Sequence, residues 1–438
     1  MARTRTHVPL GVFVNGRRVG RLRKETSGAI DFQYDRSWLE WEHTFPISLS
    51  LPLREDRYVG SSVVAVFDNL LPDSTLIRRR LAERMHAEGD DAYSLLTAIG
   101  RDCVGALQFL PGDEEPEPMR GPQGQIVSDE RVAAILGDLV RTPLGVSAEE
   151  EEFRISIAGA QEKTALLYWK DHWCIPHGST PTTHILKPQI GHLKSGIDLS
   201  RSVENEHVCM ELARALGLPT AHTTMADFAD QRVLIVERFD RQWTRDNRLL
   251  RLPQEDCCQA LSVPPTRKYQ TDGGPGIEQI LELLKASDDP AEDQRLFVRA
   301  QLVFWLLGAT DGHAKNFSLF IHPGGGFRLT PLYDVMSAQP TLDAHQIPRK
   351  KMRLAMSAGE NRHYLIDTIM PRHFVESAEN VGVPGSVVHE QLKELAALAP
   401  RAIESVIQRL PSGFPSDISS SIVGGIRQRL TLAESSPT

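Results

Sequence analysis

The feature that most constrains this chain is a cluster of polar residues directly after a long apolar segment. Residues 310–317 read TDGHAKNF and follow the apolar run LVFWLLGA. Apolar side chains upstream recur every three or four residues, which predicts a largely buried helix over 293–307. That helix would deliver the cluster of Asp311, His313, Lys315 and Asn316 to its C-terminal end. Such a cluster is either a loop that satisfies its own backbone or a chemical site.

The spacing inside the cluster and the segments after it both help to decide between a loop and a chemical site. Protein kinases use an Asp that accepts or orients the hydroxyl proton of the substrate and an Asn five positions later that binds a metal, and Asp311 and Asn316 have this spacing. Two strand-like segments flank a Pro-Gly-Gly-Gly turn at 323–326, which predicts a hairpin that ends at Asp334, where kinases place a second Asp on magnesium. Two Asp and one Asn suit Mg²⁺, whereas zinc would need more His or Cys. For the eight residues alone, a loop remains the simpler interpretation.

Segments upstream of the cluster have the order expected of a nucleotide site. A strand ends at Lys187, a helix carrying Glu204 and Glu206 follows, and a later strand runs into Glu237–Phe239. In kinases the same order belongs to the phosphate lysine, the helix glutamate and the hinge. Taken singly, the lysine could be a solvated strand end and each glutamate a surface acid. The order of these segments favours the nucleotide interpretation.

A phosphate loop is expected in SIAGAQEKT, residues 156–164. Gly159, between two alanines, would let backbone N–H groups approach a phosphate, and Lys163 would add positive charge. With one glycine the motif is weak by itself. The more glycine-rich DGGPGI at 272–277 lacks a Lys-Ser/Thr ending and favours a structural turn.

Composition limits the class of protein. The 438 residues suffice for two or three domains, and 49 basic against 57 acidic residues, a net charge of -8, give no global sign of a polyanion binder. The five cysteines are an odd number without a C-x-x-C pair, so neither a disulfide framework nor a zinc site is indicated and a cytoplasmic location is expected. Apolar runs fall short of the roughly 20 residues of a membrane span. No signal-peptide pattern is visible, so we expect neither export nor membrane insertion.

The order of predicted elements indicates several parts. The chain opens with a hairpin around Asn15-Gly16, and a helix with Asp73 or Ser74 as its N-cap follows. The Pro-, Gly- and acid-rich stretch 111–124 should be a surface linker. The expected division is a β-rich N-terminal subdomain at 1–110, a linker and helix at 111–152, a nucleotide-binding part at 153–240 and a helical lobe with the catalytic loop at 241–438.

Taken together, these segments resemble the HipA serine/threonine kinase toxins of bacterial type II toxin–antitoxin modules. The resemblance rests on TDGHAKNF, PLYDV, ISIAGAQEKTALL, WCIP, THILK, ERFDR, LRLPQED, DGGPGI and FDNLLPDS, which stretch from about residue 10 to about residue 410. It implies an α+β, bilobal protein-kinase-like fold, with a β-rich N-terminal lobe to about residue 240 and an all-helical C-terminal lobe beyond it. ATP and Mg²⁺ are the implied ligands.

The resemblance also implies roles for individual residues. Asp311 matches the catalytic base, Asn316 and Asp334 match the metal ligands, and Ser156 matches a serine that these kinases phosphorylate on themselves, which expels the phosphate loop. A dianionic group beside a phosphate-holding loop should repel nucleotide. The residues matched to ATP binding are Ala158, Gly159, Ala160, Gln161, Glu162, Lys163, Lys187, Glu237, Arg238, Phe239, His313, Asn316, Tyr333 and Asp334.

Partners follow from the same resemblance. The implied substrate is an aminoacyl-tRNA synthetase, such as glutamyl-tRNA synthetase, and the implied inhibitor is a HipB-like helix-turn-helix antitoxin. The stretch aligned with basic operator contacts, residues 376–384, has no Lys or Arg, so operator DNA should be reached mainly through the antitoxin. The alternatives are a catalytically silent corepressor that acts with such an antitoxin, and a metal-dependent phosphohydrolase built on Asp311, His313 and Asp334.

Overall fold

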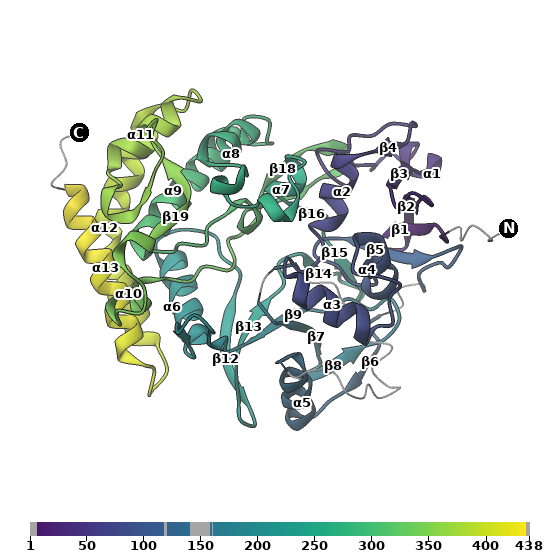
Figure 1. Ribbon diagram of the computed structural model, residues 1–438, viewed down its shortest axis with the longest axis horizontal. Coiled ribbons are helices and arrows are strands. Elements are labelled where there is room, and N and C mark those ends of the chain that lie inside the picture. The colour runs from purple at the N-terminus through teal and green to yellow at the C-terminus, as the bar shows by residue number, and fades with distance from the viewer. Residues whose placement is uncertain (1–6, 118–120, 141–157, 160, 435–438) are drawn as a thin grey trace.

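The computed structural model describes residues 7–117, 121–140, 158–159 and 161–434 (Figure 1). Two large antiparallel sheets and one short two-stranded pair form in the described part of the first 240 residues, and the longest helices follow them. This confirms the predicted mixed α+β class. Within these ranges no helix combines the length and the apolar character needed to cross a bilayer.

The N-terminal sheet has the strand order β4-β3-β2-β1-β5. Its strands are β1 (Leu10–Val14), β2 (Arg17–Lys24), β3 (Ile30–Tyr34), β4 (Tyr58–Val59) and β5 (Leu107–Pro111), and its helices are α1 (Arg36–Leu39), α2 (Ser61–Asp68), α3 (Thr75–Arg84) and α4 (Ala92–Ile99). The predicted hairpin turn is confirmed, because Asn15 and Gly16 have φ of 48° and 87° and join β1 to β2. Phe32, Phe67 and Phe109 are fully buried between the sheet and its helices.

The second sheet has the order β12-β13-β9-β7-β8-β6. Its strands are β6 (Gly124–Ile126), β7 (Thr164–Trp169), β8 (His172–Pro176), β9 (His184–Pro188), β12 (Thr223–Phe228) and β13 (Gln231–Glu237), and its helices are α5 (Asp129–Val140) and α6 (Ser202–Ala215). The short pair β10 (Gly191–His192) and β11 (Asp198–Leu199) links β9 to α6. Lys187 pairs with Leu234 in the sheet interior, so this lysine is not a solvated strand end.

The chain beyond residue 240 is mainly helical, but the expectation that it is all-helical is wrong. Its helices are α7 (Cys257–Ala260), α8 (Ile277–Leu284), α9 (Pro290–Leu307), α10 (Gln339–Asp343), α11 (Pro371–Glu379), α12 (Gly385–Arg409) and α13 (Ser416–Glu434). Its strands are β14 (Arg241–Trp243), β15 (Leu249–Arg251), β16 (Gln254–Asp256), β17 (Ser318–Ile321), β18 (Phe327–Leu329), β19 (Arg353–Ala358) and β20 (His363–Leu365). The β17–β18 hairpin predicted around the glycines is confirmed, and β16 adds to it as a third strand because its extended backbone needs a partner.

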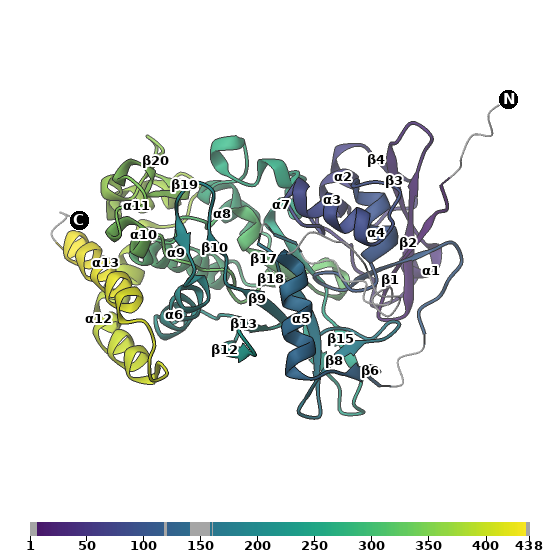
Figure 2. The same cartoon turned by 60° about the horizontal axis from the view of Figure 1, so that its bottom comes forward.

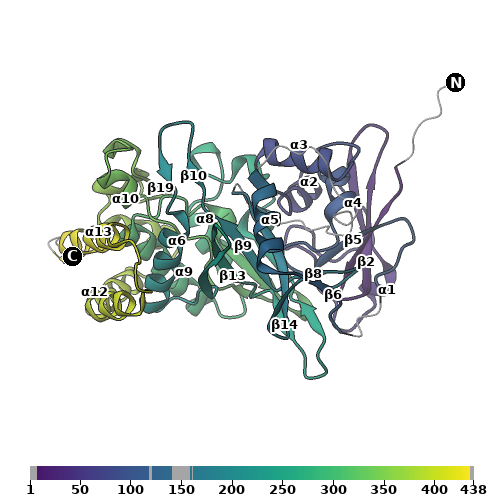
Figure 3. The same cartoon turned by 90° about the horizontal axis from the view of Figure 1, so that it is seen from below.

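The three regions lie side by side along the long axis of the molecule. The β9 and β13 strands lie between the N-terminal sheet and the helices α6, α9, α12 and α13 in every view (Figures 1, 2 and 3). Helix α9 is the centre of the C-terminal core, with Phe297, Trp305 and Leu307 fully buried. The loop after its C-terminus therefore reaches the middle of the molecule.

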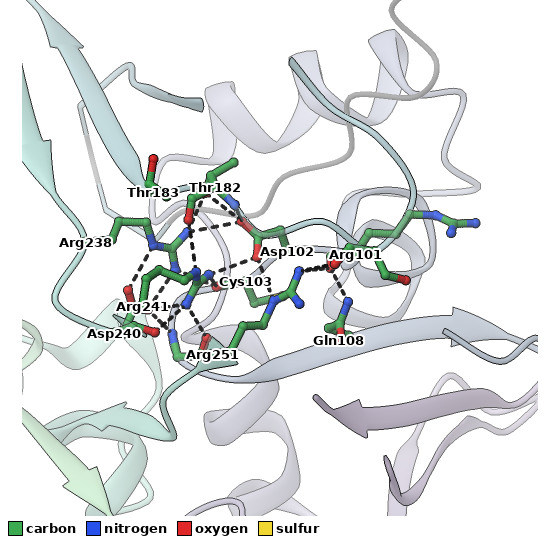
Figure 4. A network of polar contacts seen from close by, with 12 residues as sticks. Arg101, Asp102, Cys103, Gln108, Thr182, Thr183, Arg238, Asp240, Arg241 and Arg251 are labelled. Carbon is green, nitrogen blue, oxygen red and sulfur yellow. Dashed lines mark hydrogen bonds and ion pairs between the residues drawn. The ribbon is translucent and has the colours of Figure 1, made fainter. Parts of the chain in front are cut away.

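A buried ionic network joins the N-terminal region to the second sheet (Figure 4). Asp102, which follows α4, accepts hydrogen bonds from Arg251 Nε and Arg241 Nη2, each at 2.9 Å, and from Thr182 Oγ1 at 2.7 Å. Burial alone would raise the pKa of this carboxyl, but the guanidinium groups of Arg241, Arg251 and Arg238 hold it well below its usual range. Arg238 also pairs with Asp240 at 2.7 Å. The network thus fixes the segment after β13 to the N-terminal region.

Candidate active site

A cavity of about 620 Å³ lies where the second sheet, the N-terminal region and the loop after α9 meet. A cavity of this size, lined by apolar groups and a few convergent polar ones, is typical of a small-molecule site. The residues expected at the site that line it are Ala158, Gly159, Gln161, Glu162, Lys163, Lys187, Glu237, Arg238, Phe239, Asp311, His313, Asn316, Tyr333 and Asp334. Ala160 and Ser156 lie outside the described residues.

The loop after α9 is held by its own backbone and by one amide side chain. Helix α9 ends at Leu307 as expected, with Gly308 in the left-handed region at φ 67°, although it begins at Pro290, three residues earlier than predicted. Asn316 Nδ2 donates to the Asp311 carbonyl oxygen at 2.7 Å, and His313 N donates to the same oxygen at 2.9 Å. The Asn316 side chain therefore does satisfy a backbone carbonyl, as expected if the segment is a loop. The Asp311 carboxylate, however, is left exposed on the cavity side.

Asp334 is placed by the hairpin that the sequence predicts. Its φ of 61° lies in the left-handed region, which Asp tolerates better than most residues and which costs energy that the surrounding contacts must offset. The preceding Tyr333 hydroxyl donates to the Lys315 carbonyl oxygen at 2.7 Å and so ties the hairpin to the loop of Asp311. Both aspartates consequently face one cavity.

Lys187 lies between two carboxylates. Its Nζ is 2.7 Å from Asp334 Oδ1 and 2.7 Å from Glu206 Oε1 on α6. Burial would lower the pKa of Lys187, but Asp334 and then Glu206 raise it above its usual value, so the lysine stays charged. Burial likewise opposes ionisation of Asp334, yet Lys187 and Lys163 hold the pKa of Asp334 well below its usual range. The site thus keeps a fixed cation and a fixed anion side by side.

His313 is buried and lies near the carboxylates of Asp311 and Asp334. Within the described residues its Nδ1 has no hydrogen-bond partner. Burial lowers the pKa of His313 below its usual value, so the imidazole is mainly neutral at neutral pH. In the described part of the chain the buried Nδ1 is an unpaired polar atom, and other parts of the residue line the cavity.

The phosphate-loop segment is packed against the N-terminal region. Gly159 has φ 121°, and its carbonyl oxygen accepts a hydrogen bond from Asp73 N at 2.9 Å. The positive φ favours glycine here, whereas a Cβ would lie 2.4 Å from Lys163 Nζ, the end of a side chain that can move. Burial, and then the charge of Lys187, lower the pKa of Lys163 to about 8. Glu162 pairs with Arg80 at 3.0 Å instead of facing the lysines.

The hinge segment uses part of its backbone within the fold. Glu237 N donates to His222 O and Arg238 N to Thr183 O, each at 2.9 Å. The Arg238 guanidinium lies in the network of Figure 4, so this side chain positions the hinge. The Phe239 ring packs against Tyr333, with centroids 5.8 Å apart, and closes one side of the cavity.

Sequence reasoning missed several residues of the site. Ser74, one of the two predicted N-caps, caps α3, which leaves the neighbouring Asp73 for other partners. Asp73 lies 2.9 Å from Lys315 Nζ and 2.7 Å from Lys268 Nζ. Burial would raise the pKa of Asp73, but Lys315 and Lys268 lower it to about 2. The only signal in the sequence was the presence of two adjacent cap residues where one cap suffices.

The oxygen donors at the site fit a hard divalent cation. Because the Asn316 amide nitrogen is bonded to the Asp311 carbonyl, its Oδ1 is the atom left for a ligand, and Asp334 supplies carboxylate oxygen. In the part of the chain that the structure describes, no group of three or more His, Cys, Asp or Glu side chains could hold a metal. One carboxylate and one amide oxygen match Mg²⁺, which takes further ligands from phosphate and water.

Comparisons with known proteins show the family of the chain. Residues 155–403 match the family model described as the HipA-like C-terminal domain, and residues 10–110 match the HipA N-terminal domain. The chain is 36% identical to the Y4mE protein of Sinorhizobium fredii over 79% of this chain and 80% of that protein. It is 28% identical to the serine/threonine-protein kinase toxin HipA of Shewanella oneidensis over 88% of this chain and 86% of the toxin.

A solved structure extends the likeness to the whole fold. HipA of Shewanella oneidensis MR-1, in a complex with HipB and its operator DNA, superimposes with a TM-score of 0.80 at 24% identity. The alignment covers 97% of this chain and 98% of that one. The chain therefore belongs to the HipA-like family, which includes a serine/threonine-protein kinase toxin.

Proposed function

We propose that this chain is an ATP-dependent serine/threonine protein kinase that acts as the toxin of a type II toxin–antitoxin module. The observation that carries the proposal is the meeting of Asp311, Asp334 and Lys187 at one cavity, with Asn316 holding the loop between them. Kinases need a base for the acceptor hydroxyl, a metal ligand and a phosphate lysine, and each has a counterpart here.

The proposed transfer follows from these positions. The hydroxyl oxygen of the acceptor bonds to the γ-phosphorus of ATP, the bond to the β–γ bridging oxygen breaks, and ADP leaves. The hydroxyl proton passes to the exposed carboxylate of Asp311. Lys187 and Lys163 would hold phosphate oxygens, and His313 would line the cavity beside them.

Asp334 and Asn316 are the residues that would hold Mg²⁺. When bound, the cation neutralises the charge of the nucleotide phosphates. In the protein alone, Lys187 lies against Asp334 and keeps this carboxylate ionised and ready for a cation. Glu206 remains as the second partner of Lys187 when Asp334 turns to a metal.

Self-inactivation by phosphorylation of Ser156 belongs to the same proposal. Ser156 precedes Ala158–Lys163 in the sequence, and the described part of that segment is packed on Asp73 through Gly159. A phosphoryl group added next to a loop that approaches another phosphate would repel it. The contact between Gly159 and Asp73 would then be lost.

For partners, we propose a HipB-like helix-turn-helix antitoxin, with operator DNA contacted mainly through it. HipA of Shewanella oneidensis has been solved with HipB and operator DNA, and the present fold superimposes on nearly all of that chain. The proposed protein substrate is an aminoacyl-tRNA synthetase, such as glutamyl-tRNA synthetase. Co-purification with the product of the neighbouring reading frame tests the antitoxin, and phosphoproteomics after induction tests the substrate.

Labelled ATP tests the kinase activity directly. After incubation with magnesium, the wild type should carry one labelled phosphate that maps to Ser156, and Asp311→Gln should carry none. An unmodified wild type that nevertheless binds ATP would favour the alternative, a catalytically silent corepressor. Release of free phosphate without any phosphoprotein would favour a phosphohydrolase.

A further inference from the structure

The Asp311 carboxylate has a partner that the kinase motif does not provide. Tyr269, more than forty positions earlier in the chain, donates its phenolic hydrogen to Asp311 Oδ1. Among the described residues no other donor is hydrogen-bonded to this carboxylate, whereas the Asp311 carbonyl has two donors. The orientation of the side chain that would take the proton is therefore set by Tyr269.

The Tyr269 ring is held in place independently of this hydrogen bond. Its edge packs on the His313 ring, with centroids 4.9 Å apart at 82°. Its carbonyl oxygen accepts from Asp272 N at 3.0 Å and Gly274 N at 2.9 Å, which closes a tight turn. A Cβ at Gly274 would lie 2.1 Å from the Arg267 carbonyl oxygen, so the glycine is needed for this turn. The DGGPGI segment is thus a structural turn, and it presents Tyr269 to the site.

The neighbours of Tyr269 anchor the same loop on both sides. Lys268 lies 2.7 Å from Asp73 Oδ2, on the N-terminal region. The Gln270 side chain accepts from Ser357 N at 2.7 Å, on β19 of the C-terminal region. A loop fixed at both flanks places the phenol with little freedom, as a positioning group requires.

We infer that Tyr269 is a positioning residue for phosphoryl transfer, one that fixes the Asp311 carboxylate through Oδ1 and leaves Oδ2 to take the proton of the acceptor hydroxyl. The inference rests on the proposed kinase function. An exposed aspartate without a fixed partner would sample several rotamers, few of which face the acceptor. A hydrogen bond to an ionised oxygen is strong enough to select one of them.

The variant Tyr269→Phe removes the hydroxyl and keeps the ring, its contact with His313 and the backbone turn. Single-turnover labelling of the protein with ATP and magnesium, over a range of ATP concentrations, gives a maximal rate and a half-saturating ATP concentration. The maximal rate should fall about tenfold, as for loss of one hydrogen bond to a charged group. The half-saturating ATP concentration should stay within about twofold, since Tyr269 does not contact the nucleotide lysines. Tyr168→Phe removes an outward-facing hydroxyl from β7 and should change neither value.

A double-mutant cycle separates positioning from a general structural effect. In the background of Asp311→Asn, which is nearly isosteric, Tyr269→Phe should reduce the residual rate by much less than tenfold, because its action passes through the carboxylate. Equal reductions of the rate in both backgrounds would overturn the inference. A wild-type rate in Tyr269→Phe would also overturn it. So would a rate faster than wild type, which would mean that the phenol blocks the acceptor. A wild type that binds ATP and takes up no label would instead refute the kinase function and this inference with it.

Discussion

Lys187 Nζ lies 2.7 Å from Asp334 Oδ1, although the two residues are 147 positions apart in the chain. One comes from the interior of the second sheet and the other from the end of a hairpin in the C-terminal region. Their contact joins the two regions at the cavity, and the Glu206 carboxylate lies on the other side of the lysine. The first prediction follows from this ion pair.

Replacing Lys187 by Met should abolish phosphoryl transfer. The substitution leaves the buried Glu206 carboxylate and the partly exposed Asp334 carboxylate without their cation and removes the proposed phosphate contact, so the transfer rate should fall at least roughly 100-fold. Lys170→Met, in the exposed turn between β7 and β8, is the matched control and should behave as the wild type. The measurement is the initial rate of label uptake, and a rate within a few-fold of wild type for Lys187→Met would contradict the role of this lysine.

Replacing Gly159 by Ala should weaken nucleotide binding while the fold persists. The positive φ disfavours a Cβ, and strain of about 1–3 kcal/mol corresponds to a loss of roughly 5- to 150-fold in ATP affinity if the loop moves to relieve it. Gly137→Ala in α5, where a Cβ meets nothing within 4 Å, is the control. Titration with a fluorescent ATP analogue measures both, and equal affinities would show that the loop does not contact nucleotide.

Replacing Asp102 by Asn should destabilise the protein strongly. Three buried arginines lose a charged acceptor, and breaking a buried ion pair costs about 3–5 kcal/mol. Asp113→Asn, whose side chain is 91% exposed, should change the free energy of unfolding by less than about 0.5 kcal/mol. Urea unfolding with two probes measures these values. A loss near zero for Asp102→Asn would mean that the network adds no stability.

Replacing Glu255 by Gln should change how stability depends on pH. Burial raises the pKa of Glu255 to about 8 in the folded state, against an ordinary value of 4.5. The folded protein therefore keeps a proton that the unfolded chain releases, so the free energy of unfolding falls as pH rises from 4.5 towards 8. Glutamine stays neutral throughout, and the variant should lack a decrease on the order of 3 kcal/mol between pH 5 and pH 8.

Unfolding measured at several pH values tests this prediction. The exposed Glu390→Gln on α12 is the control and should follow the wild type. Parallel curves of the free energy of unfolding against pH for the wild type and Glu255→Gln would show that Glu255 is ionised in the folded protein.

The parts of the site that lie in continuous segments could be predicted from the sequence. The apolar periodicity of α9, the glycine turn of the hairpin and the D-x-x-x-x-N spacing all act within a few residues of one another, so their geometry follows from local rules. Asp311, Asn316 and Asp334 were found for this reason. Helix α9 began earlier than expected because Asp289 caps it and Pro290 fits its first position.

The remaining parts depend on contacts between distant segments. The sequence indicated Asp73 only as a candidate helix cap, and its two lysine partners come from positions 268 and 315. Tyr269 carries no motif of its own, and only the turn through Gly274 brings it to Asp311. Arg238 lines the cavity with the expected hinge, but the sequence did not show that its side chain pairs with Asp102 and Asp240, as a buried guanidinium needs carboxylates.

The proposed function requires that one cavity holds the nucleotide and presents it to Asp311. The most direct test compares ATP affinity and label uptake in Asp311→Asn, which keeps the size of the side chain and loses its charge. We predict an ATP affinity within about twofold of wild type and a transfer rate reduced at least roughly 100-fold. Label uptake at the wild-type rate, or a loss of ATP binding in parallel with the loss of transfer, would contradict it.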